Sequence, residues 1–137
     1  KDKWVVLLAL TSNQGAADFQ MLPIGNKKLY AEVVEKATQW GTSENTMFVV
    51  GATQTSEIAE LRSLAQDYFF LVPGVGAQGG NLQEVCDYGM NNQVGLLINS
   101  SREILYASKE ADFAEAASKK ATELQIQMAK VVEAMSS

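Results

Sequence analysis

Four short apolar runs recur along the chain, and each is followed by a polar loop and then by a helix-like pattern. The runs cover residues 4–10, 46–50, 68–72 and 94–98, and nearly every position in them is hydrophobic. A continuous run of this length is typical of a strand that is buried on both faces. Such strands alternating with helices predict an α/β fold with a parallel sheet and right-handed crossovers.

Apolar residues at helical spacing predict the helices that follow these strands. The first helix is expected over about 27–40, with an inner face made of Leu29, Val33, Val34, Ala37 and Trp40. A shorter helix is expected around 56–65. Asn81 is placed to cap a third helix, whose inner face would include Val85 and Cys86.

The longest helix is predicted over 109–135, and its apolar stripe is expected to be core. The stripe consists of Phe113, Ala117, Ala121, Leu124, Met128, Val131, Val132 and Met135. A structureless loop is expected over about 11–27, and loops of that length in a small domain are usually functional. No linker interrupts the pattern, which predicts one domain over 1–137.

Composition and charge exclude several classes of function. The formal net charge of −5 argues against nucleic acid, which is bound through many Lys and Arg contacts to phosphates. The chain has no His, which excludes imidazole catalysis and the commonest metal ligand. The single cysteine, Cys86, cannot form an internal disulfide, and neither a membrane span nor a signal peptide is evident. These features predict a soluble, cytoplasmic protein without a membrane partner.

The loop at 71–80 (LVPGVGAQGG) carries the strongest chemical signal, since its glycines can turn backbone N–H groups toward an anion. Another loop, 99–102 (NSSR), follows the last strand. Loops at the carboxyl ends of parallel strands open on one face, which would bring together Ser12, Thr53, Gln78 and Arg102. The segment 101–106 would be a short extra helix beside a phosphate.

Each of these residues also has a structural interpretation. Arg102 alone would more often form a surface ion pair, but its position after a strand and NSS favours a phosphate ligand. Pro73 alone is a turn former, and Ser12 is balanced between a loop role and a ligand role. Gln78 has no evident packing role between glycines. The structural interpretation is preferred for the dipeptide 53–54.

Taken in order, four motifs resemble orotidine 5′-monophosphate decarboxylase of the bacterial type. The motifs are 8–13 (LALTSN), 49–53 (VVGAT), 71–80 (LVPGVGAQGG) and 98–102 (INSSR). The match runs from about residue 4 to residue 108. That family is a (β/α)8 TIM barrel, and the motifs resemble its fifth to eighth strands. The resemblance therefore implies that this chain is the C-terminal half of a barrel.

The resemblance also implies roles for individual residues. Ser12 would hydrogen-bond the pyrimidine ring, and Pro73 would line the base pocket. Gln78 would bridge pyrimidine and phosphate on a loop that closes over the nucleotide. Arg102, with the backbone N–H groups of Ser101 and Arg102, would hold the phosphate. Gln14 departs from the family, which usually has Pro after Ser-Asn.

The family's catalytic Asp/Lys array, of the type Lys-Asp-x-Lys-x-x-Asp, has no match in this chain. The letters at 1–3 (KDK) precede the first strand, so no catalytic role is assigned to them. The implied reaction of the full enzyme, a carboxy-lyase, converts orotidine monophosphate to uridine monophosphate and CO2 without metal or organic cofactor. The first residue is not Met and adjoins a core strand, which suggests that an N-terminal half is missing. We expect this fragment to be inactive alone.

Two other functions stay open at this stage. The chain could be a stand-alone phosphate-binding module, or part of another phosphate-gripping barrel enzyme such as an aldolase or epimerase. Half a barrel would leave the strands at 4–10 and 94–98 with unpaired edges, and exposed apolar edges favour association. The expected partners are therefore a nucleotide monophosphate and further copies of the chain.

Overall fold

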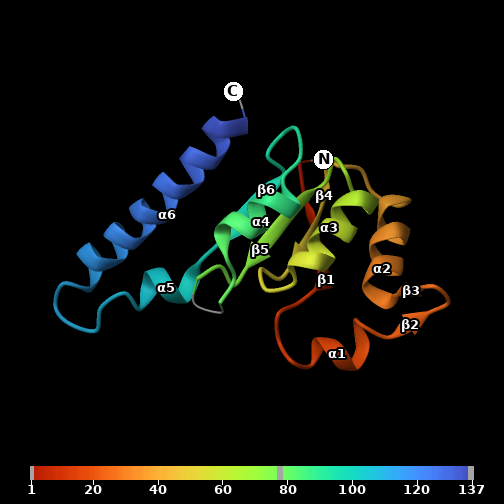
Figure 1. Ribbon diagram of the computed structural model, residues 1–137, viewed down its shortest axis with the longest axis horizontal. Helices are drawn as coiled ribbons and strands as arrows, with labels where there is room; N and C mark the ends of the chain where they lie inside the picture. The colour runs from red at the N-terminus through yellow and green to blue at the C-terminus, as the bar shows by residue number, and fades with distance from the viewer. Residues whose placement is uncertain (1, 77–78, 136–137) are drawn as a thin grey trace.

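A four-stranded parallel sheet in the order β1-β4-β5-β6 forms the centre of the molecule (Figure 1). The computed structural model describes residues 2–76 and 79–135. The strands are β1 (Val5–Leu10), β4 (Thr46–Val50), β5 (Phe69–Pro73) and β6 (Leu96–Asn99). Each pair of neighbours runs parallel, and helices connect them. The predicted α/β fold, four parallel strands alternating with helices as in half of a TIM barrel, is confirmed.

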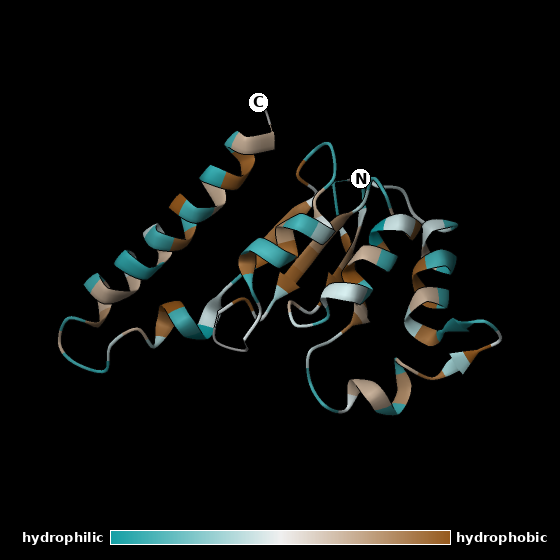
Figure 2. Cartoon of the chain, viewed as in Figure 1, coloured by the Kyte–Doolittle hydropathy of each residue, from teal (hydrophilic) through white to brown (hydrophobic). Residues whose placement is uncertain are grey.

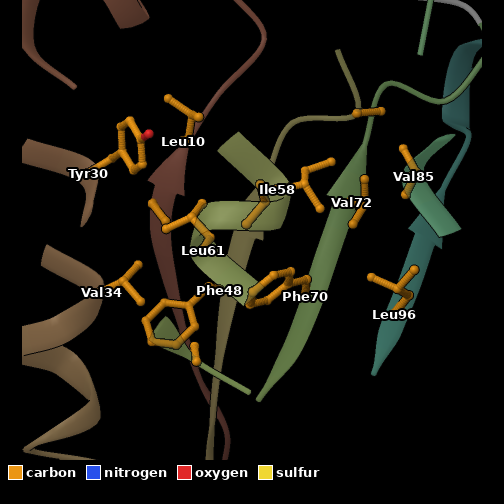
Figure 3. Packing of buried hydrophobic residues seen from close by; sticks show 14 of the residues in the cluster. Leu10, Tyr30, Val34, Phe48, Ile58, Leu61, Phe70, Val72, Val85 and Leu96 are labelled. Atoms are coloured by element: carbon orange, nitrogen blue, oxygen red, sulfur yellow. The ribbon is translucent and has the colours of Figure 1, made fainter. Parts of the chain in front are cut away.

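Three helices pack against one face of this sheet and create the core. They are α2 (Leu29–Thr38), α3 (Thr55–Leu64) and α4 (Leu82–Gly89). Figure 3 shows Phe48 and Phe70 from the sheet facing Leu61 and Ile58 of α3, and these four side chains are fully buried. Burying one such side chain contributes about 1.5–3 kcal/mol. The predicted cap of α4 is confirmed, because the Asn81 side chain accepts from the backbone of Gln83 at 2.9 Å.

The other face of the sheet carries two rows of apolar residues, which we call the open sheet face. Register places Val6, Met47 and Phe69 in one row and Leu8, Val49, Leu71 and Leu97 in the next. Val6, Leu8 and Leu97 are 47%, 58% and 45% exposed. The prediction that the first strand is buried on both faces is therefore wrong. The pattern gave the strand, but β1 lies at a sheet edge and its second face has no cover.

The segment after β1 is more structured than predicted. It holds the short helix α1 (Ala16–Phe19) and a hairpin of β2 (Pro23–Ile24) and β3 (Lys27–Lys28). Gly25, at φ +63°, allows the tight hairpin turn. The side chain of Gln20 accepts from the Thr11 backbone N–H at 2.8 Å and ties the segment to the end of β1. The prediction of a structureless loop is wrong.

Helix α2 turns a different side to the core than the spacing predicted. Tyr30 and Ala31 are buried beside Val34, whereas Val33 and Trp40 are exposed. Trp40 lies beyond the end of the helix, so it could not extend the apolar face. The Tyr30 hydroxyl donates to Glu60 of α3. Burial and that carboxylate raise the pKa of Tyr30, which keeps the phenol neutral.

After β6 the chain forms the short helix α5 (Ser101–Leu105) and the long helix α6 (Phe113–Met135), which lies beside the body of the molecule (Figure 1). Figure 2 shows hydrophilic and hydrophobic positions mixed along all of α6. Leu124, Met128 and Val131 reach the edge of the core, but no α6 residue is buried, and Phe113 is 61% exposed. The prediction that the whole stripe is core is wrong. Within residues 2–76 and 79–135, no helix combines the length and the hydrophobicity that a membrane span requires.

The amino ends of β5 and β6 are joined through one arginine of α3. The Arg62 guanidinium donates to the carbonyls of Tyr68 at 2.7 Å and Gly95 at 3.1 Å. It also donates to Gly89 at 2.7 Å and lies 3.8 Å from the centre of the Phe70 ring. This arginine fixes the end of the sheet that lies opposite the candidate site.

Candidate functional site

A pocket of about 200 Å³ opens where β5 and β6 end, and it contains three of the predicted ligand residues. The register pairs Pro73 with Asn99, so the segments that follow both strands start side by side. The lining residues are Pro73, Gly74, Val75, Asn99, Ser100, Ser101 and Arg102. Pro73 therefore shares one pocket with Ser101 and Arg102, from which it lies far apart in sequence.

The glycine loop, which we define as residues 74–80, depends on backbone conformations that favour glycine. Gly74, Gly76 and Gly79 have φ values of +93°, +78° and +84°. The Gly76 N–H donates to the Gly80 carbonyl at 3.0 Å, and the Gly79 N–H donates to Gly76 at 2.8 Å. The loop thus closes on itself beside the pocket. Gln78, a predicted ligand residue, lies outside the described residues.

Contacts with the end of β4 hold the glycine loop on its other side. The Ala52 N–H donates to the Pro73 carbonyl at 3.0 Å. A Cβ on Gly80 would overlap the side chain of Ala52 and lie 2.8 Å from the Gly74 carbonyl oxygen. Position 80 therefore requires glycine, because its backbone lies so close to Ala52. The glycine loop thus packs directly against the segment that follows β4.

Helix α5 begins inside the pocket and presents Ser101 and Arg102. The Ser101 hydroxyl donates to the Asn99 side chain at 2.7 Å, while Ser100 is buried and donates to the Val75 carbonyl at 3.2 Å. Arg102 is exposed, and within the described part of the chain no carboxylate forms an ion pair with it. The surface ion pair, which was the structural interpretation of Arg102, is not what the structure shows. The guanidinium is available to an anion.

Ser12 lies at the same edge of the sheet, but it does not line this pocket. Its Oγ is buried and finds no hydrogen-bond partner among the described residues. A Cβ on Gly51 would overlap this hydroxyl and lie 2.8 Å from the Ser12 backbone nitrogen, so glycine allows the close contact. Buried hydroxyls usually have a partner, which makes the Ser12 Oγ an open hydrogen-bonding group. Gln54, by contrast, donates to the Thr11 carbonyl at 3.4 Å, which fits its structural interpretation.

Sequence reasoning missed Ser100 and Glu103. Ser100 joins the start of α5 to the glycine loop, and the Glu103 carboxylate packs against Gly76. Hydrophobic periodicity gives no signal for such contacts, although the neighbouring Ser101 and Arg102 were singled out. No group of three His, Cys, Asp or Glu side chains in the described ranges could hold a metal ion.

Curated proteins similar to this chain include several orotidine 5′-phosphate decarboxylases. Orotidine 5′-phosphate decarboxylase of Christiangramia forsetii is 57% identical over 132 residues, which are 96% of this chain and 48% of that protein. The same enzyme of Flavobacterium johnsoniae is 50% identical over 133 residues, or 97% of this chain and 49% of its own length. No protein-family profile matches the chain.

Solved structures agree with the sequences. The chain resembles the OMP decarboxylase of Leishmania donovani with a TM-score of 0.71 and 38% identity, over 86% of this chain and 45% of that one. It resembles the UMP synthase of the same organism with a TM-score of 0.75 and 40% identity, over 90% and 28% of the two chains. The chain spans about half the length of the curated relatives it matches. By sequence and by fold, it therefore corresponds to about half of an orotidine 5′-phosphate decarboxylase.

Proposed function

We propose that the chain is the half of an orotidine 5′-phosphate decarboxylase that grips the nucleotide. The whole enzyme would convert orotidine 5′-monophosphate and a proton to uridine 5′-monophosphate (UMP) and CO2, as a carboxy-lyase in the cytoplasm. Residues 1–137 would form one domain equivalent to strands five to eight of the barrel. This half would bind the phosphate and the pyrimidine, and the catalytic Asp/Lys array would come from the other half.

The shared pocket of Pro73, Ser101 and Arg102 is the observation that carries this proposal. Arg102 is the cation, and the backbone N–H groups at the start of α5 lie beside it. An arginine can hold a phosphate through two parallel hydrogen bonds, which are stronger than neutral ones. Pro73 forms the apolar wall where the base would lie.

Two further residues, Ser12 and Gln78, belong to the proposal. Ser12 has a buried hydroxyl without a partner among the described residues, so it can hydrogen-bond a ligand. It follows β1, at the edge of the sheet where the base would extend beyond Pro73. Gln78 would connect the base and the phosphate from the glycine loop. Phosphate binding remote from the reacting carbon would contribute energy for closing this loop.

Nucleotide binding by the 137-residue chain tests the proposal. UMP titrated calorimetrically into the chain should bind. Arg102→Ala should weaken binding by roughly ten- to a hundredfold, because a hydrogen bond to a charged group contributes about 1.5–3 kcal/mol. Lys119→Ala, which removes one exposed positive charge from α6, is the matched control and should change the Kd less than about twofold. Failure of the wild-type chain to bind UMP, or equal loss in both variants, would contradict the assignment.

An activity assay tests whether the catalytic groups lie outside this half of the enzyme. The purified chain should release no CO2 from orotidine 5′-monophosphate, because it lacks the Asp/Lys array that would stabilise the developing carbanion. Turnover by the uncontaminated 137-residue chain would show that the catalytic groups lie within it.

We also propose that copies of the chain associate through the open sheet face and the unpaired edges of β1 and β6. Strand edges and exposed apolar patches of this kind favour pairing with another chain. The apolar row from Leu8 to Leu97 runs from one edge strand to the other, so an associating copy would cover this row and pair with the edge strands.

A further inference from the structure

Glu103 lies directly after Arg102 but serves a different cavity. Arg102 lines the candidate pocket, whereas Glu103 lines a second cavity of about 160 Å³ between the glycine loop and α6. Val75 and Ser100 line both cavities and so form the wall between them. Arg102 and Glu103, adjacent residues of α5, therefore lie on opposite sides of the wall that Val75 and Ser100 form.

The Glu103 carboxylate occupies the space that a side chain at position 76 would need. A Cβ built on Gly76 would overlap one carboxylate oxygen and lie 2.6 Å from the carboxylate carbon. Gly76 also has φ +78°, a conformation that other residues rarely adopt. Position 76 is thus suited to glycine, and the Glu103 carboxylate packs against this turn on the side of the second cavity.

Each oxygen of this carboxylate has one polar neighbour. Buried Ser100 lies 3.4 Å from Oε2 and shares its hydroxyl proton with the Val75 carbonyl at 3.2 Å. On the α6 side, Lys120 Nζ lies 3.6 Å from Oε1 and 3.3 Å from Glu123. The lysine pairs are exposed and contribute little to stability, but they offset the negative charge of Glu103.

We propose that Glu103 is a positioning residue, which holds residues 74–76 and 79–80 of the glycine loop in their hydrogen-bonded arrangement beside the pocket without touching the ligand. This inference rests on the proposed nucleotide site and adds to it the group that shapes the loop. The Gly76 N–H is directed to the Gly80 carbonyl, which closes the loop, and Glu103 packs at that same residue. A loop ordered before binding costs less conformational entropy when the ligand arrives.

Simple electrostatics makes the opposite prediction, which makes the proposal testable. A carboxylate this near an anion site repels the anion, so its removal should tighten binding if charge alone matters. If Glu103 positions the loop, Glu103→Ala should weaken UMP binding by about tenfold, equivalent to one lost hydrogen bond. Glu103→Gln keeps the shape and an acceptor oxygen, and it should restore a Kd near that of the wild type.

Calorimetric titration of UMP into the 137-residue variants gives the first result. Glu115→Ala, which removes an exposed carboxylate of α6, is the matched control and should leave the Kd unchanged. Weaker binding by Glu103→Ala together with recovery by Glu103→Gln supports the proposal. Binding by Glu103→Ala that is equal to or tighter than that of the wild type overturns it.

Amide hydrogen exchange gives a second result that needs no nucleotide. In Glu103→Ala, the amides of Gly76 and Gly79 should exchange about tenfold faster, while the Phe48 amide in β4 should keep its protection. Unchanged exchange in the glycine loop overturns the proposal. Should the wild-type chain not bind UMP, the nucleotide assignment fails, and the exchange experiment alone decides the role of Glu103. Glu103→Ser replaces Glu103→Ala if the alanine variant does not fold.

Discussion

At the scale of single residues, Arg62 shows how much one side chain can connect. Its guanidinium donates five hydrogen bonds, all to backbone carbonyls, from a half-buried position over the ring of Phe70. Burial lowers the pKa of Arg62 to about 10, which leaves the group charged at neutral pH. The planar guanidinium reaches these carbonyls from three nitrogens, with Nη1 sharing its two N–H groups among three of them, and a single ammonium could not reach the same set.

We therefore expect Arg62→Lys to destabilise the fold by about 2 kcal/mol, since several carbonyls lose their partner and the ring loses its stacked cation. Urea unfolding measured by circular dichroism gives the free energy. Arg102→Lys makes the same exchange at an exposed site, and it should cost less than about 0.5 kcal/mol without ligand. Equal effects at the two sites would mean that the carbonyl contacts of Arg62 add nothing to stability.

At the scale of elements, α6 differs from the helices of the core. Helix α2 buries Tyr30, Ala31, Val34 and Ala37, whereas α6 buries no side chain. Most helical stability in proteins comes from packing of an apolar face. A long helix forms its own backbone hydrogen bonds. It nevertheless unfolds locally at a small cost in free energy when few tertiary contacts hold it against the rest of the protein.

Hydrogen exchange followed by mass spectrometry should therefore show α6 exchanging faster than α2 and α3 under native conditions. The difference should be largest toward Met135, which lies beyond the residues that reach the core edge. Protection of α6 equal to that of α2 would mean that its half-buried residues hold it as firmly as a buried face.

The sequence predicted where the elements lie better than which sides they bury. All four strands were located correctly, because an apolar run bounded by polar loops is a local signal. The burial of β1 could not be predicted locally, since it depends on whether other segments cover the second face of the sheet. The face of α2 was misjudged through Trp40, which lies past the helix end. The hairpin at 23–28 could have been found from Gly25 and Asn26, a common two-residue turn.

In the candidate site too, positions at the strand ends were predictable from the sequence, whereas a side-chain contact between a helix and a loop was not. The meeting of Pro73 and Arg102 followed from parallel strands whose carboxyl ends share one edge, and the structure places both in one pocket. Glu103 was missed because its contact with Gly76 links a helix to a loop, and neither periodicity nor composition encodes it. The role of Gln78 stays a prediction.

At the scale of the whole molecule, the open sheet face should govern association. Leu8 is exposed on this face and lies in the edge strand β1, so Leu8→Glu would place a charge within an apolar contact. We expect the wild-type chain to sediment as a dimer or larger assembly at micromolar concentration, and Leu8→Glu to shift it toward monomer. Phe19→Glu changes an exposed residue of α1 away from the sheet and should have no effect. A wild-type chain that stays monomeric would contradict the proposed association.

The strand order has a consequence for the geometry of such assemblies. A two-fold axis perpendicular to the strands joins β1 to β1 or β6 to β6, antiparallel, and leaves the other two edges free. A two-fold axis along the strands instead pairs β1 of each copy with β6 of the other, and it leaves no edge free. Parallel pairing requires β6 of one copy to meet β1 of the next, which is a heterologous contact. Heterologous contacts either close into a ring or continue as a filament, and sheet twist decides between the two. The curvature of four strands thereby sets whether this chain forms a finite particle or an open polymer.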